Sequence, residues 1–165
     1  MRKQIKEKPA LTLGDSPRFI DSLEIIHKRH GVVIDHRETT FDLVTNVGKA
    51  ALAGLINGVV TTPFKYVAIG TGTTAANVAD TALEAEITTG GGARALGTCT
   101  RVTTTVTNDT AQIEVPYTFT ASFAITESGF LDSASNGVLG GRQVFSAYNV
   151  VAADELTFRW KIKAA

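Results

Sequence analysis

The sequence predicts a mainly β protein: an antiparallel β-sandwich or jelly-roll-like domain with one packed helix and an extended N-terminal arm. Three observations lead to this fold class. Apolar and polar residues alternate in short segments from residue 59 onward, which is the period of a half-buried strand. Turn-forming residues separate these segments at intervals of about 8–12 residues, as in sandwiches and small barrels. The chain also contains 23 Thr, and this β-branched residue suits a pleated surface that is half exposed to water.

The clearest helix is predicted over residues 41–58. Its apolar positions follow the i, i+3, i+4 spacing of an amphipathic helix. These positions are Val44, Val47, Ala51, Leu52 and Leu55. Gly58 stands where a glycine commonly ends a helix. We expect the apolar stripe of this helix to pack on a sheet.

The other elements predicted in the body are strands, with a long connection expected from Thr71 to Gly97. They cover residues 64–69, 101–106, 111–115, 117–125, 129–131, 138–139, 142–148 and 156–162. Asn108-Asp109 predicts a tight hairpin, and Ser135-Asn136-Gly137 predicts a second one. Pro116 predicts a sheet edge or a bulge, since proline donates no ladder hydrogen bond. In the last strand apolar residues alternate strictly with Thr157, Arg159, Lys161 and Lys163, so one face is expected to be apolar and the other cationic and wet.

Residues 1–40 are expected to form an arm, and residues 41–165 the body. The arm holds eight of the 16 basic residues and all three histidines, and it has too few apolar residues to fold alone. Within it, residues 19–30 predict a short helix and residues 32–34 a short strand. An extended arm exposes backbone N–H and C=O groups, so we expect it to lie on neighbouring subunits and to be removable without unfolding the body. The candidate partner-binding residues are Arg2, Lys3, Lys6, Lys8, Arg18 and Phe19.

Composition excludes several classes of protein. The formal net charge is zero, which argues against a general nucleic-acid binder. No apolar run approaches 18 residues, and no apolar signal-peptide core follows the first residues, so neither a membrane span nor secretion is expected. A single cysteine, Cys99, excludes an internal disulfide framework and a cysteine-based zinc cluster. A protein made in a reducing compartment is expected.

Residues 70–75 match the glycine-rich pattern G-x-G-x-x-G/A of dinucleotide-binding turns. That pattern also needs a second parallel strand that ends in an acidic residue about 20 positions later. This window falls on Gly90-Gly91-Gly92, which predicts a loop. A glycine-rich strand exit is therefore the preferred interpretation, and no cofactor is expected.

Other groupings of reactive residues are weak. His27 and His30 are three positions apart, but two histidines alone make a poor metal site. Asp35-His36 has no serine on a G-x-S-x-G elbow to complete a triad. Cys99 is expected to be a small half-buried residue rather than a nucleophile. The sequence therefore predicts no catalytic residue, no metal ligand and no enzyme activity.

Five sequence pieces resemble a family of small structural proteins of tailed bacteriophages. Residues 43–55 contain the pattern T-N-x-G-x-x-A-x-A, and residues 66–75 contain Y-x-A-I-G-T-G-T-T-A. Residues 80–86 contain D-T-A-L-x-x-E, and two later pieces, at 125–130 and 154–162, also fit. The family pattern has an Arg soon after D-T-A-L-x-x-E, whereas here Arg94 follows the triple glycine. The resemblance covers residues 41–165 and leaves the arm outside.

The resemblance implies a virion structural protein without catalytic activity, made in the host cytoplasm. The leading expectation is a capsid decoration (cement) protein that binds the assembled shell of major capsid protein as a dimer or trimer. The arm's cations would pair with acidic surface on that shell. A tail, neck or tail-fibre attachment protein, bound to ring proteins of the tail or neck, is the alternative in the same class. A host- or carbohydrate-binding module is a more distant one, and it would need exposed aromatic residues, for which Phe130 and Tyr148 are candidates.

Overall fold

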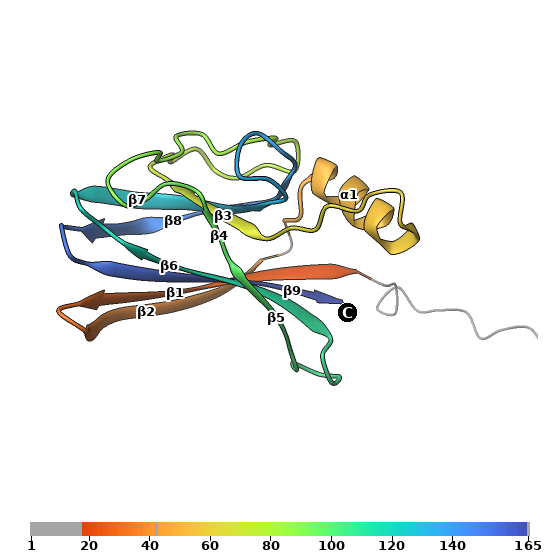
Figure 1. The fold of residues 1–165 in the computed structure, drawn as a ribbon, viewed down its shortest axis with the longest axis horizontal. Helices are drawn as coiled ribbons and strands as arrows, with labels where there is room; N and C mark the ends of the chain where they lie inside the picture. The colour runs from red at the N-terminus through yellow and green to blue at the C-terminus, as the bar shows by residue number, and fades with distance from the viewer. Residues whose placement is uncertain (1–17, 42, 165) are drawn as a thin grey trace, which may run out of the picture.

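The computed structural model describes residues 18–41 and 43–164. It confirms the predicted β-sandwich: two antiparallel sheets face each other, and one helix lies at one end (Figure 1). One sheet has five strands in the order β2-β1-β9-β6-β5, and the other has four in the order β4-β3-β7-β8. Among the described residues, no helix is both long enough and apolar enough to cross a membrane.

The elements follow the chain in a simple order. They are β1 (Phe19–Arg29), β2 (Val32–Phe41), α1 (Asn46–Asn57), β3 (Tyr66–Gly70), β4 (Ala95–Leu96), β5 (Thr98–Val102), β6 (Thr110–Thr118), β7 (Phe123–Leu131), β8 (Leu139–Val150) and β9 (Glu155–Ala164). The long connection between β3 and β4 lies over the four-stranded sheet (Figure 1).

The first forty residues differ most from expectation. The helix predicted over residues 19–30 is wrong, because this segment is strand β1, joined to β2 by a turn at His30-Gly31. Both turn residues have positive φ, 52° and 75°, as a two-residue hairpin with right-handed twist requires. Residues 19–41 thus belong to the sandwich rather than to an arm, and residues 1–17 lie outside the described residues.

Strand β1 is part of the sandwich because it pairs with β9 along its whole length. Leu23 and Ile25 lie opposite Trp160 and Phe158 in this pairing, and both aliphatic side chains are buried in the core. Deleting residues 1–40 would remove two of the five strands and expose this part of the core. We therefore expect the body to unfold without residues 1–40, contrary to the prediction from the sequence.

The predicted hairpins form, with changes in detail. Ser135-Asn136-Gly137 lies between β7 and β8, and Asn136 has a φ of 53°. Residues 103–109 form a longer loop than the tight hairpin predicted at Asn108-Asp109, because the Asp109 carboxylate accepts the backbone N–H groups of residues 104–106. Pro116 lies where β6 extends beyond its pairing with β5, so the predicted edge position is confirmed.

One predicted strand is divided in two. Residues 117–125 were expected to be continuous, but β6 ends at Thr118 and β7 begins at Phe123. The backbone N–H of Phe119 donates to Asp154, and that of Thr120 donates to Gly90. These bonds turn the chain out of the first sheet, and it then crosses to the second.

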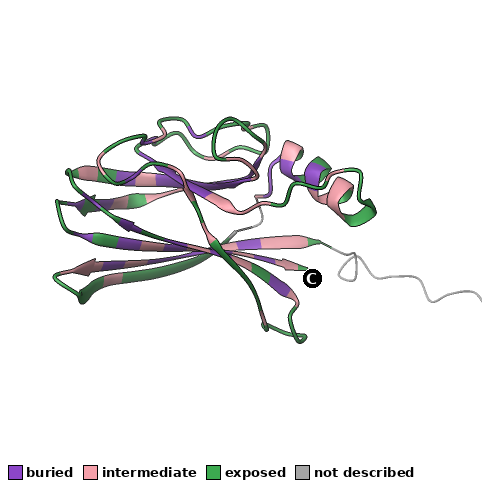
Figure 2. Ribbon diagram, viewed as in Figure 1, coloured by how far each residue is buried: buried purple, intermediate pink, exposed green. Residues whose placement is uncertain are grey.

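The core lies between the sheets and is built on the strict alternation of β9. Leu156, Phe158 and Trp160 are fully buried, and the buried positions on the facing strands complete this layer (Figure 2). The Trp160 indole N–H donates to the Ser128 hydroxyl at 3.0 Å, and the Phe130 ring lies 5.1 Å from the indole. The two sheets are thus joined by a hydrogen bond as well as by apolar contact.

Helix α1 ends at Gly58 as its sequence predicts, but it begins at Asn46, five residues later than the predicted start. The Thr45 hydroxyl accepts the N–H of Gly48 at the N-terminus, and Gly58 has a φ of 77° at the C-terminus. Only Gly48 and Ala51 of the helix are buried. A Cβ at Gly48 would overlap the backbone of Gly140, so glycine here permits close contact between α1 and β8. The expectation that the helix packs on a sheet is confirmed, though only its first turns make that contact.

Replacing Trp160 with Ala should lower the free energy of unfolding by about 3–5 kcal/mol, because the largest buried side chain is lost and a cavity remains. Denaturant unfolding followed by far-ultraviolet circular dichroism measures this, since Trp160 is the chain's one tryptophan. Trp160→Phe should cost clearly less. A midpoint unchanged in Trp160→Ala would show that this residue does not hold the sheets together.

Candidate functional site

The predicted partner-binding residues divide between the described and the undescribed parts of the chain. Arg2, Lys3, Lys6 and Lys8 lie outside the described residues. Arg18 is exposed immediately before β1, and Phe19 is the half-buried first residue of that strand. Phe19 lines a groove at the open end of the sandwich, which makes this groove the first candidate for a functional surface.

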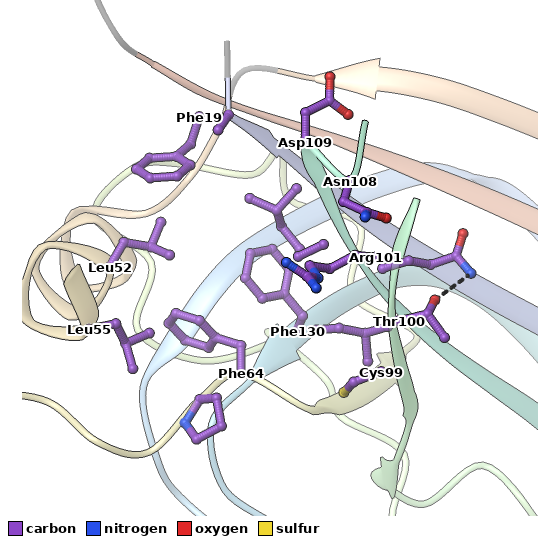
Figure 3. Close-up of a pocket in the computed structure, with 16 residues that line it drawn as sticks. Phe19, Leu52, Leu55, Phe64, Cys99, Thr100, Arg101, Asn108, Asp109 and Phe130 are labelled. Atoms are coloured by element: carbon purple, nitrogen blue, oxygen red, sulfur yellow. Dashed lines mark hydrogen bonds between the residues drawn. The ribbon is translucent and has the colours of Figure 1, made fainter. Parts of the chain in front are cut away.

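The groove has a volume of about 360 Å³ and lies between α1 and the five-stranded sheet (Figure 3). Ile113, Phe130 and Ile162 form its buried floor. Its walls are half-buried apolar side chains from distant parts of the chain: Phe19, Leu52, Leu55 and Phe64. The polar residues Arg101, Asn108 and Asp109 also line it. The apolar lining suits a hydrophobic side chain better than a polar substrate.

Helix α1 is buried against the sandwich only near its beginning, at Gly48 and Ala51. Gly48 lies against Gly140, whereas Leu52 and Leu55, farther along the helix, are half-buried and line the groove. Ile56 and Val59, at the end of the helix and just after it, are 77% and 81% exposed. This end of the molecule therefore combines an apolar hollow with exposed aliphatic residues. The sequence revealed the helix stripe but not that half of it remains uncovered.

The glycine-rich residues 70–75 have a structural role. Gly70 and Gly72 lie against the carboxylate of Glu127, a fully buried residue of β7. A Cβ at Gly72 would lie 2.6 Å from Glu127 Oε1. The backbone N–H groups of Gly72, Glu84 and Ala85 all donate to this carboxylate, at 3.1, 3.1 and 2.7 Å. The glycines thus admit a protein carboxylate rather than a phosphate.

Arg142 of β8 neutralises that carboxylate. Its Nε donates to Glu127 Oε2 at 2.8 Å, and its Nη1 donates to Asp80 at 2.9 Å. Its Nη2 lies 3.4 Å from a carboxylate oxygen of Glu84. We call Asp80, Glu84, Glu127 and Arg142 the Glu127 cluster. The cluster ties the long connection after β3 to the four-stranded sheet.

Three of the sequence pieces that resemble phage structural proteins meet at the Glu127 cluster. Gly72 comes from the piece at residues 66–75, Asp80 and Glu84 from the piece at 80–86, and Glu127 from the piece at 125–130. Arg142 lies outside the pieces, and sequence reasoning missed it. A cation was needed because a buried carboxylate requires a partner, but nothing in the spacing identified which arginine supplies it.

The histidines belong to no metal site in the structure. His27 is buried and contacts Asp154 at 3.1 Å, while His30 is exposed in the β1–β2 turn. Within residues 18–41 and 43–164, no three His, Cys, Asp or Glu residues are placed to hold a metal ion. Asp35 pairs with Arg37, and His36 contacts Glu24, so the Asp35-His36 pair is also engaged in structural contacts.

Asp154 ties β1 to the turn that precedes β9. Arg29 donates to it twice, at 2.8 and 2.6 Å, and the N–H of Val151 donates at 3.0 Å. The Arg29 guanidinium, more than the other donors, holds the pKa of Asp154 below its usual range, against the opposing effect of burial. This carboxylate is therefore ionised in the folded protein at all ordinary pH values.

The outward face of β9 is not a free cationic surface. Arg159 pairs with Glu114 of β6 and Glu24 of β1, and Lys161 pairs with Glu24 and Glu38 of β2. The expectation of a cationic face is wrong because acidic residues on the neighbouring strands neutralise it. This face has alternating charges and offers no basic stripe for a nucleic-acid backbone.

No protein-family model, curated protein or solved structure matches this chain. The resemblance to phage structural proteins stays a prediction from short sequence pieces.

The stability that Asp154 contributes should depend on pH. Since its pKa is lower in the folded state, its contribution is present above the unfolded-state pKa of about 4 and is lost as the pH falls further. The difference in unfolding free energy between the parent and Asp154→Asn should be constant from about pH 7 to 5 and shrink below pH 4. Urea titrations across this range measure it; a difference independent of pH would contradict the assignment.

Glu127→Gln should destabilise the protein by about 3–5 kcal/mol, because an amide NH₂ would face N–H donors and leave Arg142 without its buried counter-charge. Residues 71–94 should become the first site of protease cleavage. The control is Glu155→Gln, which removes an exposed carboxylate from β9. Unchanged stability and an unchanged cleavage pattern in Glu127→Gln would show that the cluster does not hold the connection.

Proposed function

We propose that this chain is a structural protein of a tailed-phage virion and that it acts as a capsid decoration protein. The observation that carries the proposal is the apolar groove beside Phe19, at the end of the fold where the described residues begin. Of the reactive side chains singled out in the sequence, His27, Asp35 and His36 are engaged in structural contacts, whereas His30 and Cys99 are exposed. Such a molecule works through the surface it presents to other subunits.

The stabilising effect of a decoration protein follows from mass action. A protein that binds the assembled shell but not its free subunits shifts the equilibrium toward assembly. Symmetric dimers or trimers placed at symmetry axes of the shell would bind through several contacts at once. Arg2, Lys3, Lys6 and Lys8 would supply charge complementarity to an acidic surface of the major capsid protein.

Location in the tail or neck is the alternative within the same class, because the four N-terminal cations would pair equally well with an acidic surface on a ring. A carbohydrate-binding module is less well supported. Tyr148 and Phe130, the two aromatic residues that were candidates for such a site, are 2% and 0% exposed. Neither can offer a stacking face to a sugar or a host receptor.

The proposal is tested with shells assembled without this chain. Adding the purified protein should raise the temperature at which the shells break, and gold-labelled antibody should mark the shell of complete particles. Labelling of the tail alone, with no thermal shift at saturation, would move the function to the tail or neck. Absence of the chain from particles would reject the virion function.

A charge-reversed variant gives the matched control. A variant with glutamate at positions 2, 3, 6 and 8 should bind the shells at least tenfold more weakly than the parent, whereas a variant with glutamine at the same positions should show a smaller loss of binding. Both variants leave residues 18–164 unchanged, so far-ultraviolet circular dichroism and the unfolding midpoint should match the parent. Equal binding of all three proteins to the shells would show that the four cations do not contribute to binding.

A further inference from the structure

The groove beside Phe19 leaves a substantial apolar surface open in the described chain. Three buried residues form its floor and four half-buried ones form its walls. Covering apolar surface is favourable because it removes that surface from water. Open apolar hollows of this kind usually mark a surface that another segment or molecule covers. A segment that covers the groove must be able to reach it.

The N-terminal residues of the same chain are the nearest candidates. The described structure begins at Arg18, and the next residue already lines the groove. Leu13 precedes Phe19 by six positions, so an extended chain could carry it about 20 Å from that residue. Gly14-Asp15-Ser16-Pro17 consists of turn-forming residues, which allow the chain to reverse over the groove mouth.

The chemistry of that segment also fits the groove. Leu11 and Leu13 are separated by Thr12, so in an extended conformation both leucines point to one side and the threonine to the other. The four cations lie farther toward the N-terminus, at positions 2, 3, 6 and 8. They cannot enter an apolar groove at acceptable cost and would stay in water. The segment therefore divides into an apolar part that can dock and a cationic part that cannot.

We propose that Leu11 and Leu13 of the same chain occupy the groove between α1 and the five-stranded sheet, with Leu52, Leu55 and Phe64 around them. Docking within one chain is favoured over docking by a free peptide because a short tether gives an effective concentration in the millimolar range. It anchors the apolar part on the body and holds the cationic part at the same end of the molecule. The inference goes beyond the proposed function and holds whether or not the chain belongs to a virion.

Cys99 makes the inference testable, because it lines the groove, is exposed and is the chain's one cysteine. Three full-length variants, Leu11→Cys, Thr12→Cys and Leu13→Cys, are equilibrated in glutathione redox buffers. Disulfide formation with Cys99 is measured by intact mass and by non-reducing gels. A disulfide requires the two Cα atoms to come within about 7 Å. The equilibrium constant for disulfide formation with Cys99 should be at least tenfold larger for the better placed of Leu11→Cys and Leu13→Cys than for Thr12→Cys.

A second measurement leaves Cys99 as the sole thiol. Leu11→Asp combined with Leu13→Asp should raise the rate at which Cys99 reacts with a bulky thiol reagent at least fivefold, since the groove is uncovered. The matched control, Ala10→Asp combined with Thr12→Asp, adds the same charge on the other side of the segment. Its reaction rate should stay close to that of the parent.

Three results would overturn the proposal. Equal disulfide formation from positions 11, 12 and 13 would indicate that the N-terminal segment meets Cys99 by random motion without binding in the groove. Disulfide-linked dimers in place of intramolecular closure would assign the groove to a neighbouring copy. Identical Cys99 reactivity in both double variants would show that the leucines do not cover the groove. None of these measurements uses particles, so their failure is distinguishable from failure of the virion proposal.

Discussion

The position of β9 between β1 and β6 is the constraint on which the rest of the structure depends. This strand pairs along its length on both sides and supplies Leu156, Phe158 and Trp160 to the core. A shift by one residue would turn these side chains to the solvent and bring Arg159 and Lys161 inside. The ion pairs on the outer face and the Trp160–Ser128 hydrogen bond between the sheets both fix the same register.

The sequence predicted correctly those elements that depend only on residues close together along the chain. The alternation of β9, the α1 stripe with Gly58 at its end, and the β7–β8 turn all follow from neighbouring residues. Strand β1 was missed because the spacing of its apolar residues resembles a helix, whereas its partner β9 lies more than a hundred residues away in sequence. The Arg29–Asp154 contact that ties its end to the sandwich is equally distant.

The candidate site could likewise be predicted only in part from the sequence. Phe19 was among the predicted partner-binding residues, but the groove it lines also needs residues that only the tertiary structure brings together: Leu55, Phe64, Ile113 and Ile162. The glycine-rich motif was interpreted from the sequence as a strand exit rather than as a dinucleotide site. Its actual partner, the buried carboxylate of Glu127, could not be identified because no local spacing links positions 72 and 127.

In this account the body is a rigid support and the N-terminal end carries the interaction. Cross-linking of intact particles with an amine-reactive reagent, followed by mass spectrometry, tests this claim most directly. The account predicts cross-links from Lys3, Lys6 and Lys8 to lysines of the shell subunit, and few from Lys161, which lies in the ion-paired face. Cross-links to the shell from Lys161 and none from the N-terminal lysines would contradict it.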